Sequence, residues 1–328
     1  MKHIQDLDEG LEVFKALSSE IRLKIIQLLV RHKHLNMNEM AEMLGITNGA
    51  LTAHIRILSK CGLVDVQLMP GKRGLQKVCH LKEDKLLIEM ASEVRLEQMY
   101  QGEIDVGHFT AYQVYPTCGI ATKDHIIGEV DDPRYFDDPE RVNAGILWFT
   151  KGFVEYRIPN YLKPWQKIVE LQFSMELSSE APGICEDWPS DIHFSLNGVP
   201  LGYWTSPGDF GAVRGLYTPV WWFPNWNQYG LLKLLSINSE GTFIDGKWIS
   251  DTTIEKLNIN HKSDIILRIS VPDTAENVGG VTIFGRGFGN YNQGIKFRII
   301  FENQANGSQT NGLTENSKQI QKKAGQNL

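Results

Sequence analysis

The feature that most constrains this fold is a pair of short apolar-patterned segments separated by Gly45-Ile46-Thr47. Glycine commonly ends a helix because it adopts the left-handed conformation without strain, and Thr47 or Asn48 is suited to begin the next helix as an N-cap. Apolar residues recur at helical spacing around this turn, and they are Met40, Ala41 and Leu44 before it and Leu51, Ile55 and Leu58 after it. Two expected strands follow at once, over residues 63–69 and 75–81, joined by turn residues 70–74.

Further helices flank this unit. We expect one over about residues 6–16, one that begins after Ser18 or Ser19, and a long final helix over about residues 82–100. Two helices joined by a short turn and followed by a hairpin predict a winged helix-turn-helix, in which the second helix enters the major groove of DNA. We assign residues 1–101 to this domain. A use of the same fold for contacts between proteins is the alternative.

Basic charge is concentrated in the same region. Residues 15–80 carry ten lysines and arginines against four acidic residues, although the whole chain has a formal net charge of −6 at pH 7. Residues 101–328 are acidic, with 19 basic and 26 acidic side chains. A locally basic segment within an acidic chain is typical of a DNA-binding module joined to a domain of another kind. Double-stranded DNA is therefore the expected partner.

The helix that follows Thr47 offers a polar face to that partner. Opposite its apolar residues lie small and polar side chains suited to base edges and phosphates. The two basic residues at the tip of the hairpin can reach phosphates or the flanking minor groove. The candidate DNA-binding residues are Asn48, Gly49, Thr52, Ala53, His54, Arg56, Lys72 and Arg73.

Two stretches of this region resemble the ArsR family of transcription regulators. The first is residues 13–26, VFKALSSEIRLKII, and the second joins residues 51–58, LTAHIRIL, with the Cys61-Gly62-Leu63-Val64 that follows. The resemblance covers roughly residues 10–90. It implies a homodimer whose first and last helices pair, so that two recognition helices lie in successive major grooves. It also implies repression that an inducer relieves.

The resemblance does not extend to metal sensing. Metal-sensing relatives carry a Cys-x-Cys-type motif on the third helix, where this chain has Met37-Asn38-Glu39-Met40-Ala41. His108, Cys118 and His125 are a weak alternative set, because strand or loop residues at such spacings are usually unrelated. The four cysteines form no C-x-x-C pair and are typical of reduced residues in a cytoplasmic protein. We expect no metal and no cofactor.

The pattern changes to strands after Gly102. Segments of alternating apolar and polar residues are bounded by turn residues, and the clearest are residues 146–158, 168–177, 191–196, 265–271 and 295–301. They predict an all-β domain over residues 102–302, a β-sandwich of the jelly-roll kind that resembles galactose-binding and carbohydrate-binding modules. The expected fold class is therefore multidomain, α+β followed by all-β. Residues 303–328 are rich in Asn, Gln, Ser, Gly and Lys and are expected to be a disordered tail.

All eight tryptophans lie in the second domain, several of them in loops rich in glycine and proline. A sugar packs its C–H faces on aromatic rings while its hydroxyls need paired donors and acceptors, so aromatic residues beside Asp and Arg favour carbohydrate binding. Tryptophans of β-sandwiches are also frequent core residues. The candidate effector-binding residues are Trp204, Asp209, Arg214, Trp221, Trp222, Trp226 and Arg286.

Together these patterns predict a dimeric, cytoplasmic transcription regulator, a repressor by the ArsR resemblance, whose jelly-roll domain senses a small carbohydrate effector. Recruitment of another protein and glycoside processing are the alternatives for that domain. Glycosidases need two carboxylates about 5–10 Å apart. No acidic pair stands out in the sequence, so we expect no enzyme. No apolar run approaches the ~20 residues of a membrane span, and the N-terminus lacks a signal-peptide stretch, so no membrane contact is expected.

Overall fold

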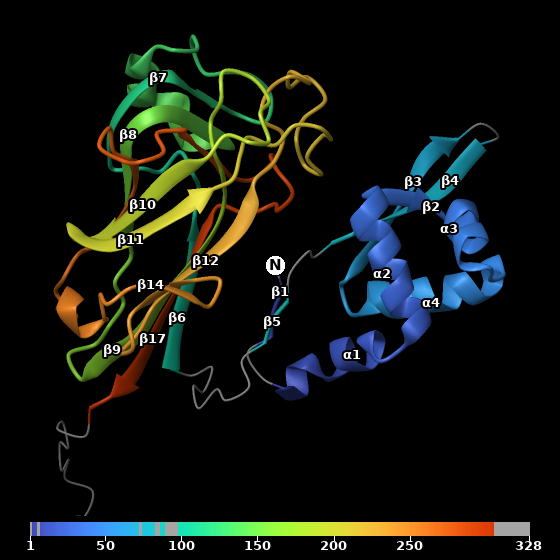
Figure 1. The fold of residues 1–328 in the computed structure, drawn as a ribbon. Coiled ribbons are helices and arrows are strands. Elements are labelled where there is room, and N and C mark those ends of the chain that lie inside the picture. The colour runs from blue at the N-terminus through green and yellow to red at the C-terminus, as the bar shows by residue number, and fades with distance from the viewer. Residues whose placement is uncertain (1, 5–6, 72–73, 83–85, 89–97, 305–328) are drawn as a thin grey trace, which may run out of the picture. The chain divides into compact units, whose positions relative to one another are not determined.

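The computed structural model describes residues 2–4, 7–71, 74–82, 86–88 and 98–304, and the chain divides into two compact units (Figure 1). The first unit spans residues 1–95 and the second residues 96–328. The division falls a few residues before the boundary expected at Gly102, because strand β6 (Met99–Ile104) pairs with strands of the second unit. No described helix is long and apolar enough to cross a membrane.

The first unit combines helices with a small antiparallel sheet. Its described helices are α1 (Leu7–Leu17), α2 (Glu20–His32), α3 (Met37–Leu44) and α4 (Asn48–Lys60). Its sheet has the strand order β2-β4-β3, with β2 at His34–Asn36, β3 at Val64–Gly71 and β4 at Gly74–Leu81. The predicted helix-turn-helix and hairpin are confirmed.

The turn between α3 and α4 is determined by its own residues. Asn36 and Glu39 form a capping box at the start of α3: the Asn36 side chain accepts a 3.0 Å hydrogen bond from the Glu39 N–H, and the Glu39 carboxylate accepts one of 3.1 Å from the Asn36 N–H. Gly45 ends α3 in the left-handed conformation, with φ at 64°. Thr47 then caps α4 by accepting a 3.2 Å bond from the Ala50 N–H.

The prediction of a final helix over residues 82–100 is wrong for the residues in this range that the structure describes. Residues Leu86–Ile88 form strand β5, which pairs in parallel with β1 (Lys2–Ile4), and β6 begins at Met99. A short continuous apolar run such as Leu86-Leu87-Ile88 has no periodicity that distinguishes a helix from a strand. Its strand conformation depends on the pairing with β1. Tyr100 in β6 stacks on Phe301 at a ring distance of 4.9 Å. Residues 83–85 and 89–97 lie outside the described residues.

The second unit is built from antiparallel strands. The longer ones are β7 (Ala111–Ala121), β8 (Ile146–Ile158), β9 (Gln166–Ser178), β10 (Ser190–Leu196), β11 (Val199–Ser206), β12 (Leu231–Ile237), β15 (Ile265–Val271) and β17 (Ile295–Asn303). Short strands are β13 (Thr242–Ile244), β14 (Lys247–Ser250) and β16 (Val281–Phe284). Two 3₁₀ turns, η2 (Pro133–Asp137) and η3 (Pro139–Asn143), lie between β7 and β8, and η4 (Glu255–Leu257) precedes β15.

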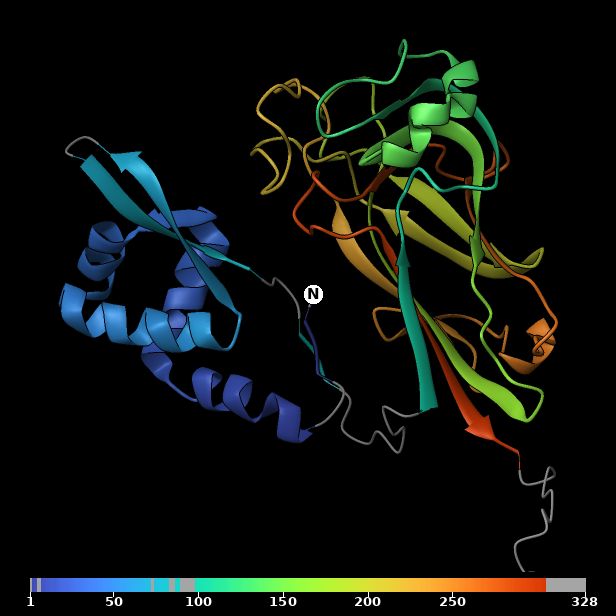
Figure 2. The same cartoon turned by 180° about the vertical axis from the view of Figure 1, so that it is seen from behind.

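These strands form two layers. One layer has the order β7-β8-β15-β10-β11, and the other has the order β6-β17-β9-β12-β13-β14 (Figures 1 and 2). Strand β16 pairs with both β8 and β9 and so joins the layers at one corner. The predicted all-β domain is confirmed.

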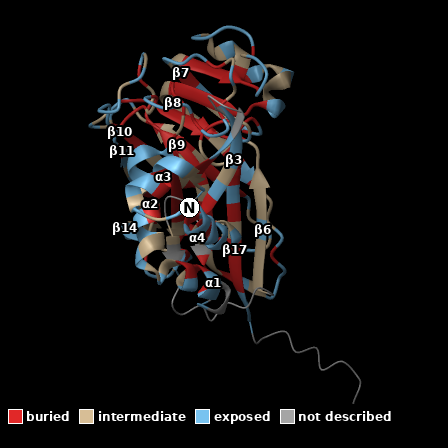
Figure 3. Cartoon of the chain, turned by 90° about the vertical axis from the view of Figure 1, so that its right-hand side faces the viewer, coloured by how far each residue is buried: buried red, intermediate tan, exposed pale blue. Residues whose placement is uncertain are grey.

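One apolar core lies between the layers. It contains fully buried aromatic side chains from both, among them Phe149 and Tyr156 of β8 and Phe173 of β9. The Tyr156 hydroxyl donates a 2.8 Å hydrogen bond to the Val106 carbonyl, which satisfies its polar atom. Figure 3 shows the buried residues, in red, concentrated on the strands. The expected tail from residue 303 begins on the last residue of β17, and residues 305–328 lie outside the described residues.

Candidate nucleic-acid interface and ligand pocket

Helix α4 divides its side chains between two faces. Leu51, Ile55 and Leu58 are buried in the core of the first unit. The opposite face is exposed and consists of five of the predicted DNA-binding residues, Asn48, Gly49, Thr52, Ala53 and Arg56. At 3.6 residues per turn, this face extends over about two turns. Its small side chains allow a close approach of the helix backbone to a partner.

The polar side chains of this face differ in what they already contact. Asn48 donates a 2.9 Å hydrogen bond from Nδ2 to Asn38 of α3, which ties the two helices together. Thr52 donates from its hydroxyl to the Asn48 carbonyl at 2.7 Å. Arg56 is exposed and pairs with no described residue. Its guanidinium is therefore available to a phosphate or a base edge.

The other predicted DNA-binding residues are His54, Lys72 and Arg73. His54 is half-buried, and its Nδ1 is buried without a hydrogen-bond partner among the described residues. That atom is closed to DNA, so any contact of His54 with DNA involves the other ring nitrogen. Lys72 and Arg73 lie outside the described residues.

The second unit has a pocket of about 160 Å³ that is partly open to solvent. It lies where β7, β8 and β16 meet three loops, one between β7 and β8, one that follows β9 and one between β11 and β12. The residues that line the pocket include Thr117, Asp131, Trp148, Glu180, Asp209, Trp222, Trp226, Asn227 and Thr282. Its volume is smaller than the ~300–1,000 Å³ of sites for drug-sized ligands, so the pocket suits only a small ligand.

Three indole rings form the apolar wall of this pocket. Trp222 lies edge-on to Trp148 at 5.7 Å and to Trp226 at 5.1 Å. Trp148 and Trp222 are buried, whereas Trp226 is half-buried. Gly119 on β7 makes room for this packing, because a Cβ there would lie 2.2 Å from the Trp148 ring. Trp222 also donates from Nε1 to the Asn227 carbonyl at 2.9 Å.

Two acidic side chains form the polar wall. Glu180 accepts hydrogen bonds from the hydroxyls of Thr282 at 2.9 Å and Thr117 at 3.4 Å. Burial, together with the nearby charge of Asp209, raises the pKa of Glu180 well above its ordinary value. Asp209 accepts a 3.0 Å bond from the Ala181 N–H through Oδ2, and burial raises its pKa to about 7.

Asn227 completes this wall with its amide held in one orientation. Nδ2 donates toward Ser178 Oγ at 2.6 Å, the Ser179 carbonyl at 2.9 Å and Thr282 Oγ1 at 3.1 Å. Oδ1 of Asn227 and Oδ1 of Asp209 are both buried and have no hydrogen-bond partner among the described residues. The residues that line the pocket therefore include buried acceptor atoms that nothing described in the chain satisfies.

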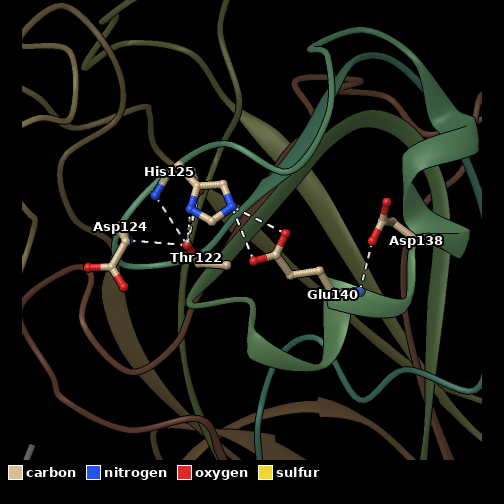
Figure 4. A network of polar contacts seen from close by, with 5 residues as sticks. All are labelled: Thr122, Asp124, His125, Asp138 and Glu140. Atoms are coloured by element: carbon tan, nitrogen blue, oxygen red, sulfur yellow. Dashed lines mark hydrogen bonds and ion pairs between the residues drawn. The ribbon is translucent and has the colours of Figure 1, made fainter.

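A turn beside the indole cluster is held by its own polar contacts (Figure 4). Thr122 Oγ1 accepts from the N–H groups of Asp124 and His125, each at 3.1 Å. The His125 ring pairs with Glu140 at 3.1 Å, and Asp138 caps η3 by accepting a 2.8 Å bond from the Glu140 N–H. These contacts pair the polar groups of the turn with one another, so we assign the groups a structural role.

The weak metal set of the sequence does not assemble. The described residues contain no group of three or more His, Cys, Asp or Glu that could hold a metal ion. Cys118 is fully buried, and burial raises the pKa of its thiol to about 12.

Comparison with known proteins bears on the first unit most directly. Residues 18–65 match the family model described as winged helix-turn-helix DNA-binding. The helix-turn-helix of the first unit is thus of the winged helix-turn-helix kind. The match runs from the start of α2 through α3 and α4 into β3, and so includes the exposed face of α4. A comparison with curated proteins gives no match.

Several solved structures are similar to parts of the chain. The winged helix is similar to a homodimeric winged helix-turn-helix domain from Mycobacterium bovis, a possible ArsR-family transcriptional regulator, with 25% identity and a TM-score of 0.21. That match covers 23% of this chain and 65% of the other. A transcriptional regulator homologue from Pyrococcus horikoshii OT3 is 27% identical over 21% of this chain and 74% of its own, with a TM-score of 0.18. The Emp47p carbohydrate recognition domain is 10% identical over 66% of this chain and 100% of its own, with a TM-score of 0.23.

Of the predicted effector-binding residues, the structure brings Asp209, Trp222 and Trp226 together in the pocket. The other four lie outside it. Trp204 packs under the Lys233 ammonium at 4.5 Å, and Trp221 donates to the Lys123 carbonyl at 2.6 Å. Arg214 donates to the carbonyl of Pro219, and Arg286 pairs with Glu103 at 2.8 Å and Asp105 at 3.4 Å.

Sequence reasoning missed the pocket residues that come from other segments. Glu180, Asn227, Trp148, Thr117, Thr282 and Asp131 all line the pocket and were not among the predicted effector-binding residues. Only Asn227 had a local signal, since it follows Trp226 directly. The others are brought together by strand pairing across long separations, which no spacing in the sequence reveals.

Proposed function

We propose that this chain is a DNA-binding transcription regulator that acts in the cytoplasm, with α4 as its recognition helix and the β domain as its sensor. The winged helix-turn-helix match over residues 18–65 carries this proposal. The exposed face of α4 supports it, because small residues lie beside an unpaired arginine above a buried apolar stripe. The net positive charge of residues 15–80 adds affinity for phosphates.

A homodimer is part of this proposal. Leu7 and Leu11 lie one turn apart on α1 and are 41% and 47% exposed, which is unfavourable for leucines that face water. Pairing of two such helices would bury both residues and place two α4 helices on one duplex. Two half-sites bound together account for the high affinity that regulators of this kind need.

For the effector, we propose a small polyhydroxylated molecule of the carbohydrate class that binds in the pocket of the second unit. Indole rings on one wall suit the C–H face of a sugar ring. Acceptor atoms without described partners on the other wall suit its hydroxyl donors. Binding would then shift DNA affinity if the two states of the dimer differ in their affinity for the effector.

The test of DNA binding is selection from fragmented genomic DNA, followed by a mobility-shift assay on the enriched fragments. Retention of particular fragments at ~0.15 M salt is the expected result, since specific binding exceeds non-specific binding by ~10³ or more. Retention that is equal for all fragments, or absent, would contradict the proposal.

A second candidate function follows from one observation, the shared pocket of Glu180 and Asp209. A glycosidase pairs a protonated carboxyl acid with an ionised carboxylate. Glu180, whose pKa is raised well above its ordinary value, would be the acid, and Asp209, with a pKa of about 7, would be the partner above that pH. Release of product from a panel of chromogenic glycosides would favour this function. Binding without turnover favours the sensor.

A further inference from the structure

The charged side chains that line the pocket of the second unit are all acidic. Carboxylates of Asp131, Glu180 and Asp209 line it from three separate segments of the chain. Its lining contains no lysine, arginine or histidine. A ligand that carries positive charge therefore meets three acidic groups and no described cation in the lining.

The hydrogen-bond donors that contact Glu180 and Asp209 are already paired, and the buried side-chain polar atoms of the lining without a described partner are acceptors. The hydroxyls of Thr282 and Thr117 donate to Glu180, and the Ala181 N–H donates to Asp209 Oδ2. Both hydrogens of Asn227 Nδ2 are directed at other protein oxygens. Oδ1 of Asp209 and Oδ1 of Asn227 are acceptors without a described partner, both on side chains more than nine-tenths buried, and a ligand donor reaches them only if the lining moves slightly.

A protonated amine meets both conditions. It has three donors and no acceptor, so it can satisfy buried acceptors without leaving a lone pair of its own unpaired. Indole rings add to this preference, because a cation over the face of tryptophan is attracted by the ring. Trp226 is half-buried and so presents part of its ring to the pocket.

We propose that this pocket binds an amino sugar, with the ammonium group at Glu180 and Asp209 and the sugar ring against the indole wall. This assignment rests on the proposed function, since it names the chemical class of the effector. Without a ligand, burial raises the pKa of both carboxyl groups, and the nearby charge of Asp209 raises that of Glu180 further. A bound ammonium acts in the opposite direction, because it attracts and stabilises the ionised carboxylates.

The test is the affinity of the full chain for matched pairs of sugars, measured by calorimetry and thermal shift near pH 7.5. D-glucosamine is compared with D-glucose, D-galactosamine with D-galactose, and N-acetyl-D-glucosamine serves as the amino sugar without a charge. We expect at least one amino sugar to bind about tenfold or more tightly than its neutral partner, the gain of a charge-assisted contact. Calcium chloride is included because carboxylates also bind calcium.

Variants locate the site. Asp209→Asn should remove most of the preference for the amino sugar, and Asp273→Asn, at an exposed position, should keep it. The sugar comparison needs only the wild-type chain, so a folding defect of Asp209→Asn leaves the test intact. Equal affinity for charged and neutral sugars would overturn the amino-sugar assignment and leave the carbohydrate effector standing. Binding of no sugar, or of calcium alone, would overturn both.

Discussion

The hydroxyl of Thr282 donates a 2.9 Å hydrogen bond to Oε2 of Glu180. Because the Thr282 hydroxyl has given its only hydrogen to the carboxylate, Thr282 Oγ1 can only accept from Nδ2 of Asn227, at 3.1 Å. The direction of this chain of hydrogen bonds fixes the Asn227 amide and leaves its Oδ1 without a described partner. The acceptor character of the pocket is thus set by three side chains from three different segments.

Arg56→Ala should abolish most DNA binding and leave the fold unchanged, because the Arg56 side chain is exposed and makes no hydrogen bond or ion pair with a described residue. Loss of a bidentate contact to a base costs about 1–3 kcal/mol, which is roughly 5- to 150-fold in affinity. A mobility-shift assay on the selected fragments measures it. Lys24→Ala is the matched control, since Lys24 is a basic residue of α2 paired with Glu20 on the helix surface. Equal binding by Arg56→Ala and wild type would remove α4 from the interface.

Leu11→Asp should shift the chain from dimer to monomer, because it places a charge at the centre of the exposed apolar side of α1. Light scattering coupled to size exclusion measures the mass. Glu12→Gln, one residue along the same helix, alters the charge of an exposed side chain and should leave the mass unchanged. A monomeric wild type, or a dimer that persists in Leu11→Asp, would refute the α1 interface.

Trp222→Ala and Trp226→Ala should separate packing from binding. Trp222 is fully buried among Trp148 and Phe288, so its truncation should cost about 3–5 kcal/mol of unfolding free energy. Trp226 is half-buried, so its truncation should cost less and should weaken sugar binding. Urea unfolding and calorimetry measure the two effects. Greater destabilisation by Trp226→Ala than by Trp222→Ala would reverse their assigned roles.

The stability of the second unit should fall as pH rises from about 4 to about 7. Asp209 titrates near 3.9 when unfolded, and burial raises its pKa to about 7 in the folded chain. Within that window the folded chain holds a proton that the unfolded chain has released, so raising the pH favours unfolding. Asp209→Asn cannot ionise, and its stability relative to wild type should therefore improve over the window.

Tryptophan fluorescence follows this unfolding, because all eight tryptophans belong to the second unit. Asp273→Asn, at an exposed position, should track the wild type at every pH. A constant difference between Asp209→Asn and wild type from pH 4 to pH 7 would show that Asp209 ionises normally.

Local patterns in the sequence were enough for most of the elements. The patterns over residues 146–158 and 265–271 predicted β8 and β15 with the bounds that the structure shows, because β15 and the last five residues of β8 alternate buried with less buried side chains. The capping residues around Gly45 likewise placed α3 and α4. The final helix failed because Leu86-Leu87-Ile88 pairs with a strand at the other end of the unit, and such pairing leaves no local trace.

The site was harder to foresee than the fold. The tryptophan-rich loop pointed to Trp222 and Trp226, yet Trp204 and Trp221 in the same stretch contact other parts of the domain. Glu180 becomes a pocket residue only because β16 brings Thr282 beside the end of β9. Aromatic content predicts a binding domain, whereas the position of each ring depends on strand order.

The most direct test of a sensor joined to a DNA-binding domain is the DNA affinity of the full chain with and without D-glucosamine. Wild type should change its affinity for the selected fragments by at least about 5-fold at saturating D-glucosamine, the lower end of typical coupling between sites. Trp226→Ala should bind the same DNA and show no response. An unchanged affinity in wild-type protein saturated with the sugar would contradict the coupling of the two units.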